Sequence, residues 1–237
     1  MKRVAIFASG SGSNAQNLIH YYHVCHPEKD VKISLIVANR PDAYVLERAR
    51  LLNVPALVFS REEFYPQIEL PIAEVSDTKS PVAESPVTES PVTELPVAEL
   101  PIAELPYPLL NALSAHKIDY IILAGFLWLI PQYLIDAFPG RIVNIHPALL
   151  PAYGGKGMYG MNVHRAVVAN GEAESGITIH LVDNQYDHGS PLFQARCRVD
   201  VGETPESLSE KIHLLEQEHF PKVIDKWING SSGKSAV

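Results

Sequence analysis

Short apolar runs that alternate with helical stretches restrict the possible folds of this chain more than any other feature of its sequence. Residues 4–8, 31–37 and 54–59 have the length and apolar content of strands that are buried on both faces of a sheet. Helical stretches at 15–22 and 43–52 separate these runs. This order predicts an α/β fold with an open, mostly parallel, twisted sheet and helices on both of its faces.

The second half of the chain continues the same pattern. We expect helices at 109–116, 131–137 and 162–170, strands at 118–126, 141–145, 176–182 and 191–199, and a long amphipathic helix from Thr204, with Leu208, Ile212, Leu215, His219 and Val223 on its apolar face. The run at 118–126 is the most hydrophobic of the strands, so we expect it at the centre of the sheet.

A five-residue repeat interrupts this pattern. From Pro71 to Pro106, proline opens almost every copy of sequences such as PVAES and PVTEL. Proline at this spacing excludes a helix and removes the donors of a sheet. We therefore predict a single domain over residues 1–230, interrupted by an extended, largely disordered insertion at about 68–106 and followed by a flexible tail at 231–237. We favour a tolerated loop expansion, which costs little free energy, over a docking segment for a partner.

Charge and cysteine content argue against several classes of protein. The net charge is −8, but seven acidic residues and one lysine fall within the repeat, so the remainder of the chain carries about −2. That balance argues against nucleic-acid binding. Cys25 and Cys197 lack the spacing of a metal site or a disulfide framework. No apolar run approaches the ~20 residues of a membrane span, and the apolar N-terminus leads into a Gly/Ser turn, so we expect a cytoplasmic protein without metal or membrane partner.

A loop of small residues follows the first predicted strand, where residues 9–14 read SGSGSN. Small residues let backbone N–H groups approach an anion, and the N-terminus of the next helix adds a favourable dipole. Ser11, Ser13 and Asn14 supply further donors and are suited to cap that helix. The loop lacks the Gly-Lys-Ser/Thr of a Walker A loop, and Ala15 occupies the third glycine position of GxGxxG. It favours a phosphate monoester site, with a tight, well-capped turn as the alternative.

Two polar side chains lie at the carboxyl end of the strand at 141–145, where ligands bind in open parallel sheets. Alternation places Asn144 and His146 on the same side. The Asn144 amide offers donors to a developing oxyanion, and His146 offers a proton at neutral pH. Asp187, in a later polar loop, is a candidate carboxylate partner that would raise the pKa of a histidine. Taken singly, His146 also fits a structural histidine, Asp187 a solvated aspartate, and His180 a structural residue of its strand.

Together and in this order, these motifs resemble the glycinamide ribonucleotide (phosphoribosylglycinamide) formyltransferase family. The resemblance rests on GSGSN at 10–14, NRPDAYVLERA at 39–49, SRE at 60–62, AGFLWLI at 124–130, NIHPALLP at 144–151 and YDHG at 186–189. It implies a formyltransferase-like fold with a Rossmann-like N-terminal half. It also implies an enzyme of de novo purine biosynthesis that transfers the formyl group of 10-formyltetrahydrofolate to the amine of glycinamide ribonucleotide, with these two small molecules as its partners and a monomer or weak homodimer as its state.

The resemblance also assigns roles to individual residues. Asn144, His146 and Asp187 match the catalytic residues, Gly12, Ser13, Asn14 and Glu216 match substrate-binding residues, and Arg61, Leu127, Trp128, Leu129, Ile130 and Asn144 match the site of the folate. Residues 127–130 are expected to line the pterin pocket partly through backbone groups. Other members carry other residue types at the position of Trp128, which fits a backbone role there.

The sequence departs from the family at the Gly-rich stretch 153–161 and at Asn162, where some members carry a histidine.

Three other interpretations of the function remain open. Methionyl-tRNA formyltransferases share the HP-x-LLP motif but carry a nucleic-acid domain, and formyltetrahydrofolate hydrolases carry an N-terminal regulatory domain. A non-catalytic nucleotide-binding scaffold that presents the proline repeat would bind folate without turnover.

Overall fold

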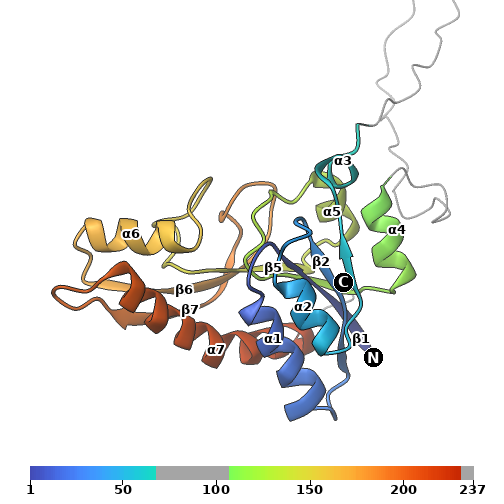
Figure 1. The fold of residues 1–237 in the computed structure, drawn as a ribbon, viewed down its shortest axis with the longest axis horizontal. Helices are drawn as coiled ribbons and strands as arrows, with labels where there is room; N and C mark the ends of the chain where they lie inside the picture. The colour runs from blue at the N-terminus through green and yellow to red at the C-terminus, as the bar shows by residue number, and fades with distance from the viewer. Residues whose placement is uncertain (68–106, 231–237) are drawn as a thin grey trace, which may run out of the picture.

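A seven-stranded sheet forms the centre of the computed structural model, which describes residues 1–67 and 107–230 (Figure 1). The strand order is β3-β2-β1-β4-β5-β6-β7. The strands are β1 Lys2–Ala8, β2 Val31–Ala38, β3 Ala56–Val58, β4 Tyr120–Leu123, β5 Ile142–His146, β6 Glu174–Leu181 and β7 Pro191–Arg198. The insertion predicted at 68–106 and the tail at 231–237 lie outside the described residues.

The first five strands run parallel, whereas β6 pairs antiparallel with β5, and β7 pairs antiparallel with β6. The mostly parallel sheet is therefore confirmed. The hydrophobic run at 118–126 contributes β4, which stands in the middle of the strand order as predicted.

The helices also follow the predicted order. They are α1 Ser13–His20, continued by a π-helical turn Tyr21–Cys25, then α2 Val45–Leu51, α3 Arg61–Phe64, α4 Pro108–Ala115, α5 Gln132–Ala137, α6 Met161–Ala169 and α7 Pro205–Gly230. The sequence analysis missed the short α3. Its signal is a capping box, in which the Ser60 side chain accepts from the Glu63 N–H (3.3 Å) and the Glu63 carboxylate accepts from the Ser60 N–H (2.8 Å).

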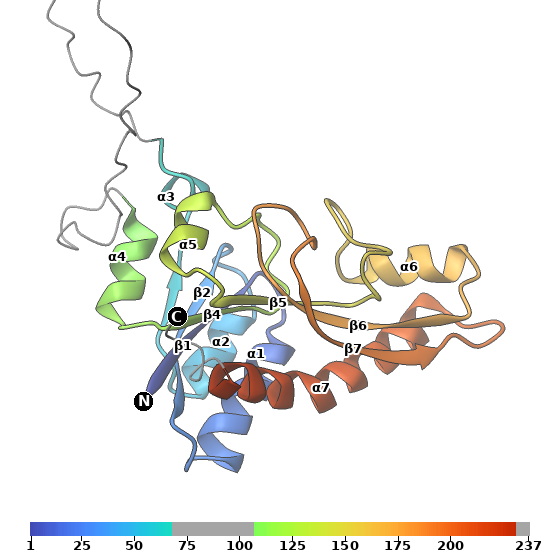
Figure 2. The same ribbon diagram turned by 180° about the vertical axis from the view of Figure 1, so that it is seen from behind.

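The alternation of β1 divides the core into two layers. Val4, Ile6 and Ala8 point into one cluster of buried side chains, whereas Ala5 and Phe7 point into the other. The first cluster takes its helical members from α1, α2, α6 and α7, and the second from α3, α4 and α5. Figures 1 and 2 show α4 and α5 on one side of the sheet and α1, α2 and α7 on the other, as predicted.

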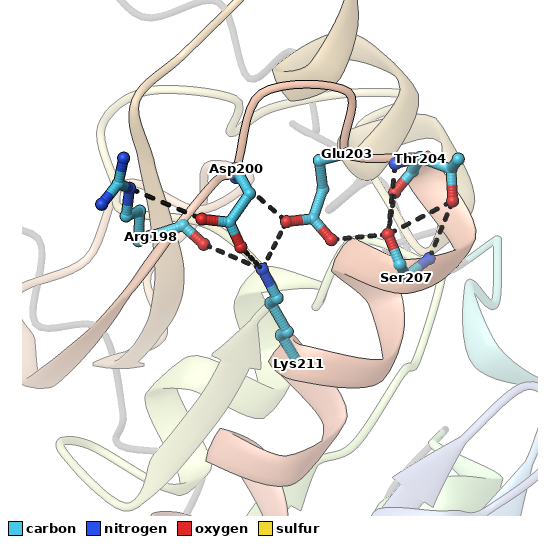
Figure 3. A network of polar contacts seen from close by, with 6 residues as sticks. All are labelled: Arg198, Asp200, Glu203, Thr204, Ser207 and Lys211. Carbon is cyan, nitrogen blue, oxygen red and sulfur yellow. Dashed lines mark hydrogen bonds and ion pairs between the residues drawn. The ribbon is translucent and has the colours of Figure 1, made fainter.

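A network of polar contacts fixes the start of α7 against the end of β7 (Figure 3). Thr204 Oγ1 accepts from the Ser207 N–H (3.1 Å) and caps the helix. Lys211 Nζ donates to Asp200 Oδ2 over 2.7 Å and also to Glu203, and Ser207 Oγ donates to Glu203 Oε1 over 2.5 Å. These hydrogen bonds from Lys211 and Ser207 lower the pKa of Glu203 to about 2.

The predicted apolar face of α7 packs against the core. Leu208 and Ile212 are buried as expected, but the later buried positions are Phe220, Pro221, Ile224 and Ile228. Leu215 and Val223 are partly buried against the same core, and the His219 ring lies 5.1 Å from that of Phe193. The helix crosses several strands of a twisted sheet, so the side that faces the sheet changes along its length.

The carboxyl ends of β1, β4 and β5 lie at the point where the strand order reverses direction. From β1 the chain moves outward to β2 and β3, then returns to place β4 on the other side of β1. Ligands bind at such a switch point in open α/β sheets.

No helix in the described part of the chain is long and apolar enough to cross a membrane.

Candidate active site

A cavity of about 1090 Å³ opens at this switch point. Its walls come from the loops after β1, β4 and β5, from the loop before α6, from the Asp187 loop and from α7. The structure brings eleven predicted site residues to this cavity, namely Gly12, Ser13, Asn14, Arg61, Leu127, Trp128, Leu129, Asn144, His146, Asp187 and Glu216. Ile130 is the exception among the predicted residues, since it is 3% exposed and packs in the core.

His146 is held between two acceptors. Its Nδ1 lies 3.4 Å from Asp187 Oδ1, and its Nε2 donates to the backbone oxygen of Tyr153 over 2.8 Å. A carbonyl oxygen only accepts, so Nε2 carries a proton, and Nδ1 faces the carboxylate. The ring is 3% exposed. The contacts of both ring nitrogens fix the orientation of this buried ring.

Asn144 uses both of its amide hydrogens within the protein. Its Nδ2 lies 3.2 Å from Asp187 Oδ1 and 3.1 Å from His180 Nε2. His180 Nδ1 contacts the carbonyl oxygen of Leu181 at 2.7 Å, so this ring donates through Nδ1 and accepts through Nε2. His180, which alternation alone would leave as a structural residue, therefore orients Asn144.

Asp187 is the centre of this cluster. Burial on its own would raise the pKa of this carboxyl, but hydrogen bonds from His146 and from the Gly155 N–H (2.9 Å) hold it well below its usual range. Asp187 also has a positive φ of 55°. The carboxylate is thus ionised at neutral pH, as a partner that stabilises a histidine cation must be.

The small-residue loop after β1 ends in a left-handed residue at the start of α1. Gly12 is the N-cap of this helix with φ 74°, and it makes no side-chain capping bond. The expectation that Ser11, Ser13 or Asn14 caps the helix is therefore wrong, because the cap position falls on a glycine. The N–H groups at the start of α1 have no side-chain cap, which suits an anion.

Asn14 connects this loop to the last helix. Its Nδ2 donates to Glu216 Oε2 over 2.9 Å, across 202 residues of sequence. Glu216 also lies 3.4 Å from His213 Nδ1, and the resulting hydrogen bond raises the pKa of His213. The predicted substrate-binding glutamate thus lies beside the predicted phosphate loop.

Arg61 lies at another part of the cavity wall, on α3. Its guanidinium carbon is 5.1 Å from the ring centre of Tyr65 and 5.9 Å from that of Trp128. Tyr65 is itself fixed by a hydrogen bond to the Leu129 carbonyl oxygen (2.6 Å). The Trp128 indole ring therefore takes part in this wall, and the two aromatic rings hold a cation where an anionic ligand group could reach it.

The sequence analysis missed several contributors to this site. The Tyr153 carbonyl and the Gly155 N–H are backbone groups of the Gly-rich loop and leave no signal in residue types. His164 also lines the cavity, from the inner face of α6, and only its place on that helix could have indicated it.

Within residues 1–67 and 107–230, no three His, Cys, Asp or Glu side chains are grouped so as to hold a metal ion.

Comparisons with known proteins agree with this geometry. Residues 2–224 match the formyl transferase family. The chain is 37% identical over 220 residues to a chloroplastic phosphoribosylglycinamide formyltransferase of Arabidopsis thaliana, covering 92% of this chain and 62% of the relative. It is 29% identical to phosphoribosylglycinamide formyltransferase of Bacillus subtilis, covering 94% of this chain and 93% of that one.

Solved structures give the same result. The crystal structure of glycinamide ribonucleotide transformylase 1 from Geobacillus kaustophilus superposes with a TM-score of 0.71 at 34% identity, covering 95% of this chain and 97% of that chain. The chain spans about three fifths of the length of the plant relatives that it matches. The match over residues 2–224 and the similarity of the folds show that this chain belongs to the formyl transferase family.

Proposed function

We propose that this protein transfers the formyl group of 10-formyltetrahydrofolate to the amine of glycinamide ribonucleotide, in de novo purine biosynthesis. The observation that carries the proposal is that one cavity joins an uncapped helix start at Gly12, a buried histidine beside a carboxylate at position 146 and an arginine over two aromatic rings at position 61. A phosphate fits the first of these, a reacting formyl group the second, and a folate carboxylate the third.

The chemistry follows from the cluster around Asp187. The acceptor amine attacks the formyl carbon on N10 of the folate, and negative charge develops on the formyl oxygen. Protonated His146 stabilises this charge when its Nε2–H turns from the Tyr153 carbonyl to the formyl oxygen. A hydrogen-bond donor to a developing oxyanion contributes about 3 kcal/mol to the stability of the transition state. The bond from carbon to N10 then breaks, N10 takes up a proton, and the new amide nitrogen loses one.

Asn144 needs a modified role in this scheme. Both of its amide hydrogens already bond to Asp187 and His180 in the structure. For the Asn144 amide to serve the oxyanion, one of these hydrogen bonds must be exchanged for one to the formyl oxygen. Asp187 accepts from Nδ1 of His146 and keeps that ring charged throughout.

An assay of acceptor-dependent deformylation tests the proposal. Purified protein, glycinamide ribonucleotide and a 10-formyl folate are mixed, and the deformylated folate is followed by its absorbance. We expect turnover only when the acceptor is present. Deformylation without acceptor would indicate a hydrolase, and folate binding without turnover would indicate a scaffold. The absence of a metal requirement is checked in the same assay with a chelator.

The remaining expectations about the protein stay predictions. A monomer predicts a sedimentation coefficient that stays constant with protein concentration, whereas a weak homodimer predicts one that rises with concentration. Small-molecule partners alone predict no retention on nucleic acid. The cytoplasmic location is checked by fractionation against organelle markers, which matters because plant relatives carry the word chloroplastic in their names.

A further inference from the structure

His164 is a buried histidine that the scheme above does not use. It lies on α6 and is 4% exposed, yet it is part of the wall of the cavity. Its Nδ1 is buried and has no hydrogen-bond partner. Buried polar atoms are nearly always paired, so an unpaired one beside a cavity points to a partner that a ligand supplies.

The place of His164 relative to the other groups indicates which part of a ligand would lie there. The ring is close enough to Glu216 and to His146 to interact electrostatically with both. Glu216 is bonded to Asn14 of the phosphate loop, and His146 belongs to the reacting centre. His164 therefore lies between the phosphate end of the cavity and the position of the formyl group.

The acceptor of the proposed reaction has its groups in the same order. Its phosphate is followed by the ribose and then by the glycinamide group that ends in the attacking amine. A side chain between the phosphate loop and His146 would therefore contact the ribose or the glycinamide. Because His164 is close to His146, the glycinamide is the part that it would contact. We propose that the imidazole of His164 hydrogen-bonds the glycinamide part of the acceptor and positions its amine for attack. This inference rests on the proposed function and adds a residue to it.

The surroundings of His164 suit an uncharged ring in this role. Burial lowers the pKa of His164, the nearby His146 acts in the same direction, and Glu216 acts against them. A neutral imidazole has one nitrogen that accepts and one that donates. It can therefore accept from an amine or amide N–H of the glycinamide. An uncharged amine that donates an N–H to this ring keeps its lone pair free to attack the formyl carbon.

Substitutions that differ only in polarity test this role. His164→Leu fills a similar space without a polar atom, and His164→Asn retains a polar group near the place of Nδ1. We expect kcat/KM for the acceptor to fall about 10-fold to 100-fold in the leucine variant, the usual range for losing one hydrogen bond to a substrate. The KM for the folate should stay within about 2-fold, and the asparagine variant should recover part of the loss.

A control on the same helix separates packing from substrate contact. Val167→Ala removes two methyl groups from a residue that is 1% exposed on α6. It should lower the melting temperature while leaving the KM for both substrates unchanged in the folded protein. A leucine variant that keeps the wild-type kcat/KM for the acceptor would overturn the inference. So would a loss that appears equally in the KM of the folate and the KM of the acceptor.

A binding measurement keeps the test decisive if the leucine variant folds poorly. Calorimetry with glycinamide ribonucleotide alone is expected to give weaker binding to His164→Asn than to the wild type, and equal affinity would count against the contact. In wild-type protein, an imidazole nitrogen resonance that is missing in His164→Asn should shift when this ligand is added. No acceptor-dependent turnover in the wild type would instead refute the proposed function.

Discussion

Replacing Gly12 by alanine tests the backbone on which the proposed phosphate loop depends. Gly12 has φ 74° and ψ 24°, in the left-handed region. A Cβ added there would lie 2.5 Å from Val45 Cγ2, 2.6 Å from Val45 Cβ and 2.9 Å from Val45 Cα. The last of these contacts involves the backbone, so a change of the Val45 rotamer cannot relieve it.

Two costs follow from this geometry. A left-handed conformation costs a residue with a Cβ about 1–2 kcal/mol, and overpacking of a core contact costs about 1–3 kcal/mol. We therefore expect Gly12→Ala to lower the free energy of unfolding by about 2–5 kcal/mol. In a chain of this size each kcal/mol lowers Tm by about 2–4 °C. The affinity for the phosphate-bearing acceptor should fall as well, because the start of α1 must move.

Urea denaturation followed by circular dichroism measures the loss, with Gly10→Ala as the matched control. A Cβ at Gly10 meets no atom within 4 Å, so that variant should stay within about 0.5 kcal/mol of the wild type. A Gly12→Ala protein as stable as the wild type would refute the reasoning. Equal losses in the two variants would also refute it, since they would reflect loop flexibility rather than contact with Val45.

Three further predictions follow from the same structure. Asp187→Asn removes the charge that faces His146 and should lower kcat by about 10²–10⁴ with a normal circular dichroism spectrum; a variant with nearly wild-type turnover would remove Asp187 from the mechanism. Phe64→Ala empties a fully buried position and should cost about 3–5 kcal/mol in urea denaturation, whereas a loss below about 1 kcal/mol would contradict its place in the core. The pKa of Glu203 is lowered from 4.5 to about 2, so this group stabilises the fold above pH 4.5 and loses that effect as the pH falls towards 2. Lys211→Met should therefore lower Tm at pH 7 and narrow the difference in Tm between pH 7 and pH 3, and an unchanged difference would argue against this pair.

Local sequence patterns were sufficient for much of the sheet. The apolar runs around Val4, Val31 and Ile142 predicted buried strands because a strand that is covered on both faces needs apolar side chains at every position. The period of two placed Asn144 and His146 on one side, and both line the cavity. Helix α3 was not predicted, although its capping box at Ser60 is a local signal in the sequence.

Contacts between distant segments required the tertiary structure. The hydrogen bond between Asn14 and Glu216 joins the first helix to the last one. The position of the Tyr153 carbonyl against His146 depends on how the Gly-rich loop folds back, and no residue type records that path. The same holds for His180, whose contact with Asn144 depends on the register between β5 and β6.

The sequence by itself determined the order and type of most elements, the small-residue loop at Gly12 and the polar residues at the end of β5, because short-range periodicity and backbone sterics govern them. Only the tertiary structure decided that Gly12 rather than a serine begins α1, that both ring nitrogens of His146 have acceptors, and that His164 lies beside the cavity. These features depend on loops and helices that meet across the sheet, where packing rather than local propensity decides which atoms come together.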